Sequence, residues 1–440
     1  MTLTIKKISL FWIPLAATWL MMAVEGPFLA AVIARLVEPK FNLAAYGVAF
    51  SIALLFEAPI IMIMTASTAL VKDRESLLKL RNFTYGLNTI VTLVMLLLLV
   101  PPLFHCIMQD LVNLPDPLAR LTYQACVILL PWPAAIGYRR FYQGVLIRSN
   151  LTRRVAYGTI VRLLTMAAAA LTAVWLTDLQ GALVGAVALS SGVCAEAAAS
   201  RLMARAPVHH ILDILPAQES RTGLTYGSIT EFYTPLALTS ILALGVNPLV
   251  TFFLGHSRMA IESLAVLPVI TSLIFIFRSM GLSFQEVGIA LLGEEDEGYP
   301  ALKRFAVLLG FAVLICLALV AFTPLSHVWF HYVSGLSLEL DRFATLPTRI
   351  LTGLPVLMVL LAFQRAVLVK HRQTRPITVA SAIELAGIMI LLPITIKGFG
   401  MVGAVAAALS LLIGRLLANT YLFVPFLRVV RKRDRRDARP

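Results

Sequence analysis

The feature that most constrains this chain is an internal repeat. Residues 11–35 align with residues 232–256 without a gap, at an offset of 221 in a chain of 440 residues. The identical positions include Pro14 and Pro235, Leu15 and Leu236, Ala16 and Ala237, Thr18 and Thr239, and Pro27 and Pro248. Gln143 and Gln364 are related by the same offset. In a membrane protein, two halves of equal size are typical of a transporter whose substrate site lies between them.

The composition indicates an all-α integral membrane protein. Hydrophobic residues make up 59% of the chain and charged residues 14%, whereas a soluble domain carries about 25% charged residues. About 20 apolar residues cross a bilayer. We predict about twelve transmembrane helices, at roughly 8–36, 44–71, 80–104, 120–148, 155–177, 181–204, 223–255, 262–292, 300–325, 344–369, 376–396 and 399–427. No GxxxxGK[ST] loop is present, so ATP-driven transport is disfavoured, and we expect no enzyme.

The net charge of +14 reflects topology rather than nucleic-acid binding. Basic residues are concentrated in alternate loops and in the tail, which places both termini in the cytoplasm. Each half carries six spans, so the repeat is parallel about a pseudo-twofold axis along the membrane normal. We predict an N-lobe over 1–205, a cytoplasmic linker over 206–221, a C-lobe over 222–427 and a basic tail over 428–440. The tail is expected to lie on anionic lipids.

Charged residues deep in the spans are the first candidates for a functional site. Glu57 and Arg278 occupy equivalent positions of the repeat with opposite charges. We predict that they contact substrate or act as a gate, the alternative being a mutual salt bridge. Arg162 and Glu384 show the same reversal after a one-residue gap, and we predict that they pair the two lobes. The alternative for Arg162 and Glu384 is a purely structural ion pair, or snorkelling toward the membrane surface.

Further polar residues extend this hypothesis. Glu25 precedes Gly26 and Pro27, a sequence that suits a broken helix, so we predict that Glu25 binds a coupling H⁺ or Na⁺. The alternative is a carboxylate hydrogen-bonded to a neighbouring helix. The other predicted cavity residues are Arg139, Arg140, Arg365, Glu286 and Asn247. Glu196 and Arg415 also reverse their charges, but we expect their helices to be peripheral. No cofactor, metal site or disulfide is expected, because the four cysteines lack CxxC spacing.

Several motifs resemble a known superfamily. GVLIRSNLTRR follows the fourth predicted span and AVLVKHRQTRP follows the tenth. This arrangement resembles the multidrug/oligosaccharidyl-lipid/polysaccharide (MOP) flippase superfamily, which has the fold of the MATE exporters. NLAAYGVAFSIALLFEAPI, YTPLALTSILALGVNPLV and GMVGAVAAALSLLIGR look most like its progressive ankylosis family. That resemblance implies export of small anions such as pyrophosphate, nucleotides and citrate. A short chain without a long acidic tail looks like a bacterial relative, expected in the inner membrane.

The residues and the resemblance together predict a secondary active exporter or antiporter. We expect a monomer that moves a small organic or phosphorylated anion (citrate, pyrophosphate or nucleotide-like) by alternating access. Three alternatives stay open: a multidrug exporter of cations, a flippase of lipid-linked oligosaccharide precursors, and a non-transporting scaffold or receptor. Deep charges and prolines in both halves argue against the last of these.

Overall fold

The computed structural model describes residues 3–149, 151–213, 224–293, 296–371 and 373–437. All of the elements in these ranges are helices, so the predicted all-α class is confirmed. The contacts divide the chain into two compact units. Unit 1 comprises Met1–Arg35 and Ser257–Pro440, and unit 2 comprises Leu36–His256.

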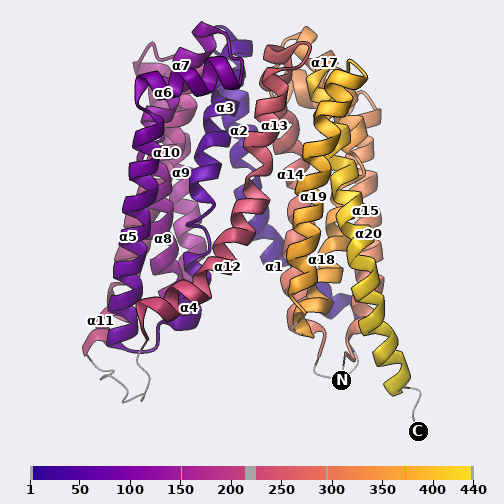
Figure 1. Ribbon diagram of the computed structural model, residues 1–440. Helices are drawn as coiled ribbons and strands as arrows, with labels where there is room; N and C mark the ends of the chain where they lie inside the picture. The colour runs from indigo at the N-terminus through magenta and orange to yellow at the C-terminus, as the bar shows by residue number, and fades with distance from the viewer. Residues whose placement is uncertain (1–2, 150, 214–223, 294–295, 372, 438–440) are drawn as a thin grey trace. The chain divides into compact units, whose positions relative to one another are not determined.

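Unit 2 contains twelve described helices (Figure 1). They are α3 (Pro39–Glu57), α4 (Ile63–Leu70), α5 (Arg74–Leu98), α6 (Pro101–His105), η1 (Cys106–Leu111), α7 (Asp116–Ile128), α8 (Pro131–Arg148), α9 (Thr152–Leu176), α10 (Gly181–Met203), α11 (Arg205–Asp213), α12 (Tyr226–Leu244) and α13 (Val246–Gly255). Helix α11 occupies the first part of the predicted linker. Residues 214–221 of that linker lie outside the described residues.

Unit 1 contains the remaining described helices (Figure 1). They are α1 (Ile5–Ala23), α2 (Glu25–Ala34), α14 (Ala260–Leu291), α15 (Tyr299–Phe322), α16 (Leu325–His327), η2 (Val328–Val333), α17 (Leu338–Leu351), α18 (Leu354–Lys370), α19 (Arg375–Pro393), η3 (Ile394–Gly398) and α20 (Gly403–Asp437). Helix α20 continues into the predicted basic tail, of which residues 438–440 lie outside the described residues.

The internal repeat is visible in the order of the helices. The first span of each half is broken at an equivalent residue, Val24 between α1 and α2 and Gly245 between α12 and α13. A π-helix occurs in both halves, η1 and η2, at an offset of 222 residues. The two halves therefore share helix breaks and distortions as well as apolar spans.

The first span of each half packs with helices of the other half. In unit 1, α1 packs against α14 and α15, and Trp12 Nε1 donates a 2.8 Å hydrogen bond to Ser283 Oγ. In unit 2, α12 and α13 pack against α3, and the Tyr233 hydroxyl donates to the Pro59 carbonyl at 2.6 Å. This grouping differs from the predicted lobes 1–205 and 222–427, because apolar periodicity locates a span without identifying the helix it contacts.

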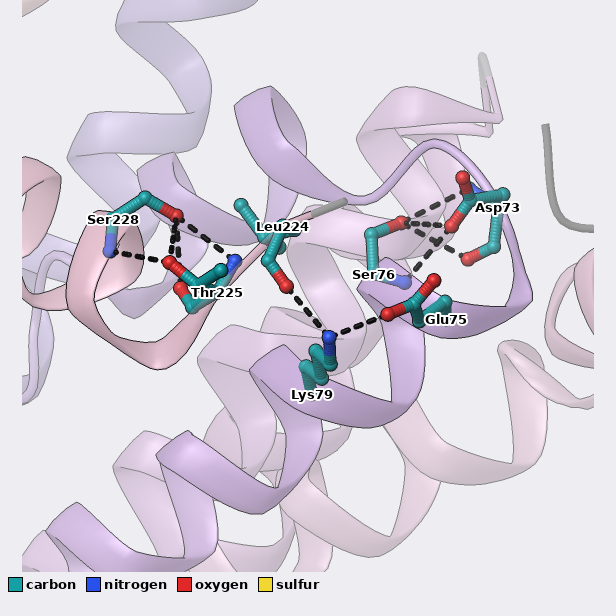
Figure 2. A network of polar contacts seen from close by, with 7 residues as sticks. All are labelled: Asp73, Glu75, Ser76, Lys79, Leu224, Thr225 and Ser228. Atoms are coloured by element: carbon teal, nitrogen blue, oxygen red, sulfur yellow. Dashed lines mark hydrogen bonds and ion pairs between the residues drawn. The ribbon is translucent and has the colours of Figure 1, made fainter. Parts of the chain in front are cut away.

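Polar caps explain where two helices of unit 2 begin (Figure 2). Asp73 and Ser76 form a reciprocal capping box at the start of α5, and Thr225 and Ser228 form another at the start of α12. Each box satisfies backbone N–H groups that have no partner in the first turn. Lys79 pairs with Glu75 and donates to the Leu224 carbonyl at 2.9 Å. That contact connects α5 to the segment that leads into α12.

The chain is a multi-pass membrane protein. In the described ranges, ten helices are long and apolar enough to cross a bilayer. The count becomes eleven when Arg74–Leu98 and Pro101–Leu111, bent by 75°, are taken as one span. The predicted span at 120–148 is the one missing from the twelve, and its helix is interrupted between α7 and α8 just before Pro131. The interruption alone does not exclude it, because the span Leu338–Lys370 is interrupted between α17 and α18 and is still counted. Helix α8 also carries Arg139 and Arg140, which lower its hydropathy.

Candidate functional site

The unit-2 cluster is a group of largely buried polar side chains contributed by four helices of unit 2. Its members are Glu57 on α3, Arg139, Arg140 and Gln143 on α8, Arg162 on α9 and Glu196 on α10. Glu196 is only 1% exposed and forms an ion pair with Arg139. Arg162 Nη1 lies 3.8 Å from Glu196 Oε2, and Gln143 Nε2 donates to Glu196 Oε1 at 3.0 Å. One carboxylate therefore connects α8, α9 and α10.

Glu57 lies at the end of α3, where the second span is interrupted before α4. Its side chain is 6% exposed and within electrostatic reach of Arg140, Arg139 and Arg162. Among the described residues of unit 2, Glu57 forms no ion pair and no side-chain hydrogen bond. A carboxylate at the negative end of a helix dipole is unfavourable, so the arginines of α8 are needed to stabilise it there.

The unit-1 cluster is the corresponding group in unit 1. Its members are Arg278 on α14, Arg365 on α18, Glu384 on α19 and Arg415 on α20. Arg415 Nη2 pairs with Glu384 Oε1 at 2.8 Å, and both side chains are only slightly exposed. Arg365 Nη2 donates to Ser381 Oγ at 3.2 Å. Arg278 lies within electrostatic reach of Arg415 and Glu384, but pairs with no carboxylate among the described residues of its unit.

Two buried amides support the unit-1 cluster. Gln364, the repeat equivalent of Gln143, donates from Nε2 to the Asn419 carbonyl at 3.3 Å. Asn419 Nδ2 donates to the carbonyl oxygens of Leu357 and Arg415, at 3.2 Å and 2.9 Å. These contacts hold α18 against α20, so Arg365 and Arg415 are carried by helices whose separation is set by hydrogen bonds.

Glycines bring the paired helices of each unit into close contact. A Cβ on Gly192 of α10 would lie 3.1 Å from the Arg162 carbonyl oxygen of α9. A Cβ on Gly414 of α20 would lie 3.1 Å from the Glu384 carbonyl oxygen of α19. Both relations hold at an offset of 222 residues, and α19 and α20 run side by side (Figure 1). The same helix contact therefore recurs in both units with the charge on its first helix reversed.

Both clusters contain more arginines than carboxylates. The unit-2 cluster has three arginines and two glutamates, and the unit-1 cluster has three arginines and one glutamate. Burying an unbalanced charge in a bilayer is costly. Each cluster therefore has a formal positive charge that an anion could neutralise.

Arg162 and Glu384, predicted to pair with one another, both have partners inside their own units. Arg162 lies beside Glu196, and Glu384 pairs with Arg415. The charge reversal therefore needs no pairing between the halves, and that pairing stays a prediction. Glu196 and Arg415, expected to be peripheral, are the partners that complete the two clusters. The repeated glutamines, Gln143 on α8 and Gln364 on α18, lie on helices that pack against α10 and α20.

Three predicted site residues lie outside the clusters. Glu25 is the first residue of α2 and is 8% exposed, at a position where the positive end of the helix dipole stabilises a carboxylate. The neighbouring Gly26 faces Ser272 of α14 so closely that a Cβ would lie 2.7 Å from Ser272 Cβ. Glu286 on α14 is exposed and accepts a hydrogen bond from Trp19, and Asn247 is exposed on α13. Their functional roles stay predictions.

Comparisons with solved structures show the fold. No family model and no curated protein matches the chain. An inward-facing multidrug resistance MATE family transporter of the MOP superfamily matches with TM-score 0.70 and 12% identity, over 94% of this chain and 96% of that one. The lipid II flippase MurJ matches with TM-score 0.69 and 13% identity, over 95% and 90%.

A third structure is a MOP superfamily transporter from Pyrococcus furiosus, in which reverse polarity of the binding pocket suggests a different function. It matches with TM-score 0.63 and 13% identity, over 97% of this chain and 96% of that one. The chain therefore has the MATE-like fold of the MOP superfamily, and these structural neighbours are transporters and flippases rather than enzymes.

Proposed function

We propose that this protein is a secondary transporter that exports a small organic or phosphorylated anion by alternating access. The observation that carries the proposal is the arginine surplus in both clusters. Positive charge at bilayer depth favours binding of an anion, because the anion replaces lost hydration with charge-assisted hydrogen bonds. A site for a cationic drug would need the opposite surplus.

Arg278 is the residue that we assign to the substrate. It occupies the repeat position of Glu57, and in its own unit no described carboxylate pairs with it. Arg140 and Arg365 are also available, since neither forms an ion pair with a described carboxylate. Arg139 is engaged by Glu196, so its role is to hold α8 and α10 together. Glu57 is the candidate gate, and Glu25 is the candidate for H⁺ or Na⁺ coupling.

The comparisons support this proposal without identifying the substrate. The structural neighbours include multidrug transporters, a lipid flippase and a transporter whose pocket polarity is reversed. The resemblance to the progressive ankylosis family favours pyrophosphate, citrate or a nucleotide. We further propose a monomer in the bacterial inner membrane with both termini in the cytoplasm.

The test is flux in proteoliposomes, with citrate, pyrophosphate and ATP compared with a cationic dye. Arg278→Gln should reduce anion flux about tenfold or more, because it removes one charged hydrogen-bond donor from the substrate. Arg278→Lys should retain more of the flux than Arg278→Gln. The matched control is Arg120→Gln, which removes an arginine that is 72% exposed and paired with Asp116 at the surface. Glu25→Gln in the same vesicles should abolish the dependence of flux on a pH or Na⁺ gradient.

Other outcomes would contradict the proposal. Dye flux without anion flux would indicate a multidrug exporter despite the arginine surplus. Anion flux that is equal in wild type and Arg278→Gln would remove Arg278 from the pathway.

A second candidate is a flippase of lipid-linked oligosaccharide precursors, favoured by the likeness to the lipid II flippase. The same arginine clusters suit a diphosphate headgroup. The test is transfer of a fluorescent polyprenyl-diphosphate sugar across the vesicle bilayer. Such transfer, without flux of the soluble anions, would favour the flippase function.

A further inference from the structure

A separate pocket lies on unit 1, lined by residues near the start of α1 and the end of α20. Figure 1 shows where these two helix ends lie. It has a volume of about 640 Å³ and is formed by the first turns of α15 together with Ile5 and Arg433. None of its lining residues belongs to the unit-1 cluster. Any ligand that it holds is therefore distinct from the transported anion.

Three cations surround this pocket, and none of its described lining residues is acidic. The side chains of Lys303 and Arg304 are exposed on α15. The Arg433 guanidinium lies 3.9 Å from the centre of the Tyr299 ring. Tyr299 is buried and packs against Phe363 and Phe426. Because the Tyr299 ring is fixed by this packing, it holds the Arg433 guanidinium in position. A guanidinium that is already positioned loses less conformational entropy when it binds an anion.

The other wall of the pocket is apolar and continues along the lipid-facing side of α15. Val307 and Leu308 line the pocket and are 50% and 54% exposed. The exposed apolar residues that follow on α15 are Phe311, Ile315, Leu319 and Phe322. In a membrane span, such residues contact acyl chains, and cations at the end of the span lie at headgroup depth. The pocket therefore lies at the boundary between the acyl chains and the lipid headgroups.

We propose that this pocket binds one anionic phospholipid. Its phosphate pairs with Lys303, Arg304 and Arg433, and its acyl chains follow Val307 and Leu308 along α15. A zwitterionic lipid adds an ammonium group that these cations repel, so the pocket selects by headgroup charge. Of the basic tail that was expected to lie on anionic lipids, Arg433 is the residue that this proposal assigns to the lipid phosphate. The inference holds whatever substrate the protein transports.

The test is native mass spectrometry of the full-length protein in detergent, titrated with phosphatidylglycerol or phosphatidylcholine of identical acyl chains. Wild type should retain phosphatidylglycerol at a concentration at least about tenfold lower than phosphatidylcholine. Lys303→Gln/Arg304→Gln/Arg433→Gln should remove that preference. Lys303→Gln/Arg304→Gln changes only exposed side chains, so it should reduce the preference for phosphatidylglycerol without affecting folding. The matched control, Lys72→Gln/Arg74→Gln/Arg205→Gln, removes three exposed cations of unit 2 and should retain the full preference for phosphatidylglycerol.

The alternative outcomes overturn the proposal. Equal losses in the pocket variant and the control variant would indicate a diffuse surface potential rather than a site. Equal retention of the two lipids by wild type would exclude selection by charge. Displacement of bound phosphatidylglycerol by millimolar inorganic phosphate or glycerol phosphate would make this a phosphate site without a lipid ligand.

Discussion

The α9–α10 contact of unit 2 and the α19–α20 contact of unit 1 have the same geometry and opposite charges. Each places a glycine against a carbonyl of the facing helix, and each buries an ion pair beside it. In unit 2 the arginine lies on the first helix of the pair, and in unit 1 the glutamate does. The comparison shows that the repeat retains close backbone approach, which depends on glycine, while the direction of the ion pair can change.

The two contacts also differ in how many partners each carboxylate has. Glu196 is 1% exposed and contacts Arg139, Arg162 and Gln143. Glu384 pairs with Arg415 and has a 12% exposed side chain. Because Glu196 compensates two buried arginines, we expect unit 2 to depend on its carboxylate more than unit 1 depends on Glu384.

The largest expected effect is the loss of the Glu196 charge. Glu196→Gln should lower the free energy of unfolding by about 3–5 kcal/mol, because it removes the carboxylate that pairs with two buried arginines. Glu384→Gln should cost about 2 kcal/mol, since one charged hydrogen bond is lost at a more exposed position. Titration with SDS in mixed micelles measures both values.

Asp116→Asn is the control for these two variants. It affects an ion pair with Arg120 that is largely exposed, so the change should stay within about 1 kcal/mol. If Glu384→Gln proves as costly as Glu196→Gln, the number of partners does not explain the difference between the units.

An exchange of charges in unit 1 should sharpen the comparison. Glu384→Arg alone places a fourth arginine in the unit-1 cluster with no carboxylate to balance it. Glu384→Arg/Arg415→Glu restores an ion pair in the direction that unit 2 uses, and should recover about 2 kcal/mol relative to the single variant. The same SDS titration, with Arg415→Glu completing the double-mutant cycle, gives the coupling energy. A coupling energy near zero would mean that the direction of the pair is determined by its surroundings.

The smallest expected effect concerns the glycines. Gly414→Ala should cost about 1 kcal/mol or more, because its Cβ would lie 2.8 Å from Ile388 Cγ1, and Gly192→Ala should cost about 1 kcal/mol. Gly86→Ala is the control, because nothing lies within 4 Å of its Cβ, and it should stabilise α5 by about 0.5–1 kcal/mol. Equal effects of all three substitutions on thermal unfolding would show that helix propensity, not close packing, governs these positions.

Much of the architecture could be predicted from local sequence. Residues 11–35 and 232–256 indicated the repeat, and Glu25, Gly26 and Pro27 indicated a broken helix that the structure places at Val24. The span at 120–148 was harder, because α8 carries Arg139 and Arg140 and is separated from α7 just before Pro131. Proline alone does not locate a break, because Pro14, Pro235 and Pro268 lie inside continuous helices.

The sequence by itself determined the membrane environment, the two related halves and the presence of charges at equivalent positions, because hydropathy and periodicity are properties of single segments. Only the tertiary structure decided which helix each segment contacts. It gave Arg162 the partner Glu196, gave Glu384 the partner Arg415, and grouped the first span of each half with helices of the other. Those choices depend on side-chain shape and charge at contacts between residues distant in the chain, which no local pattern records.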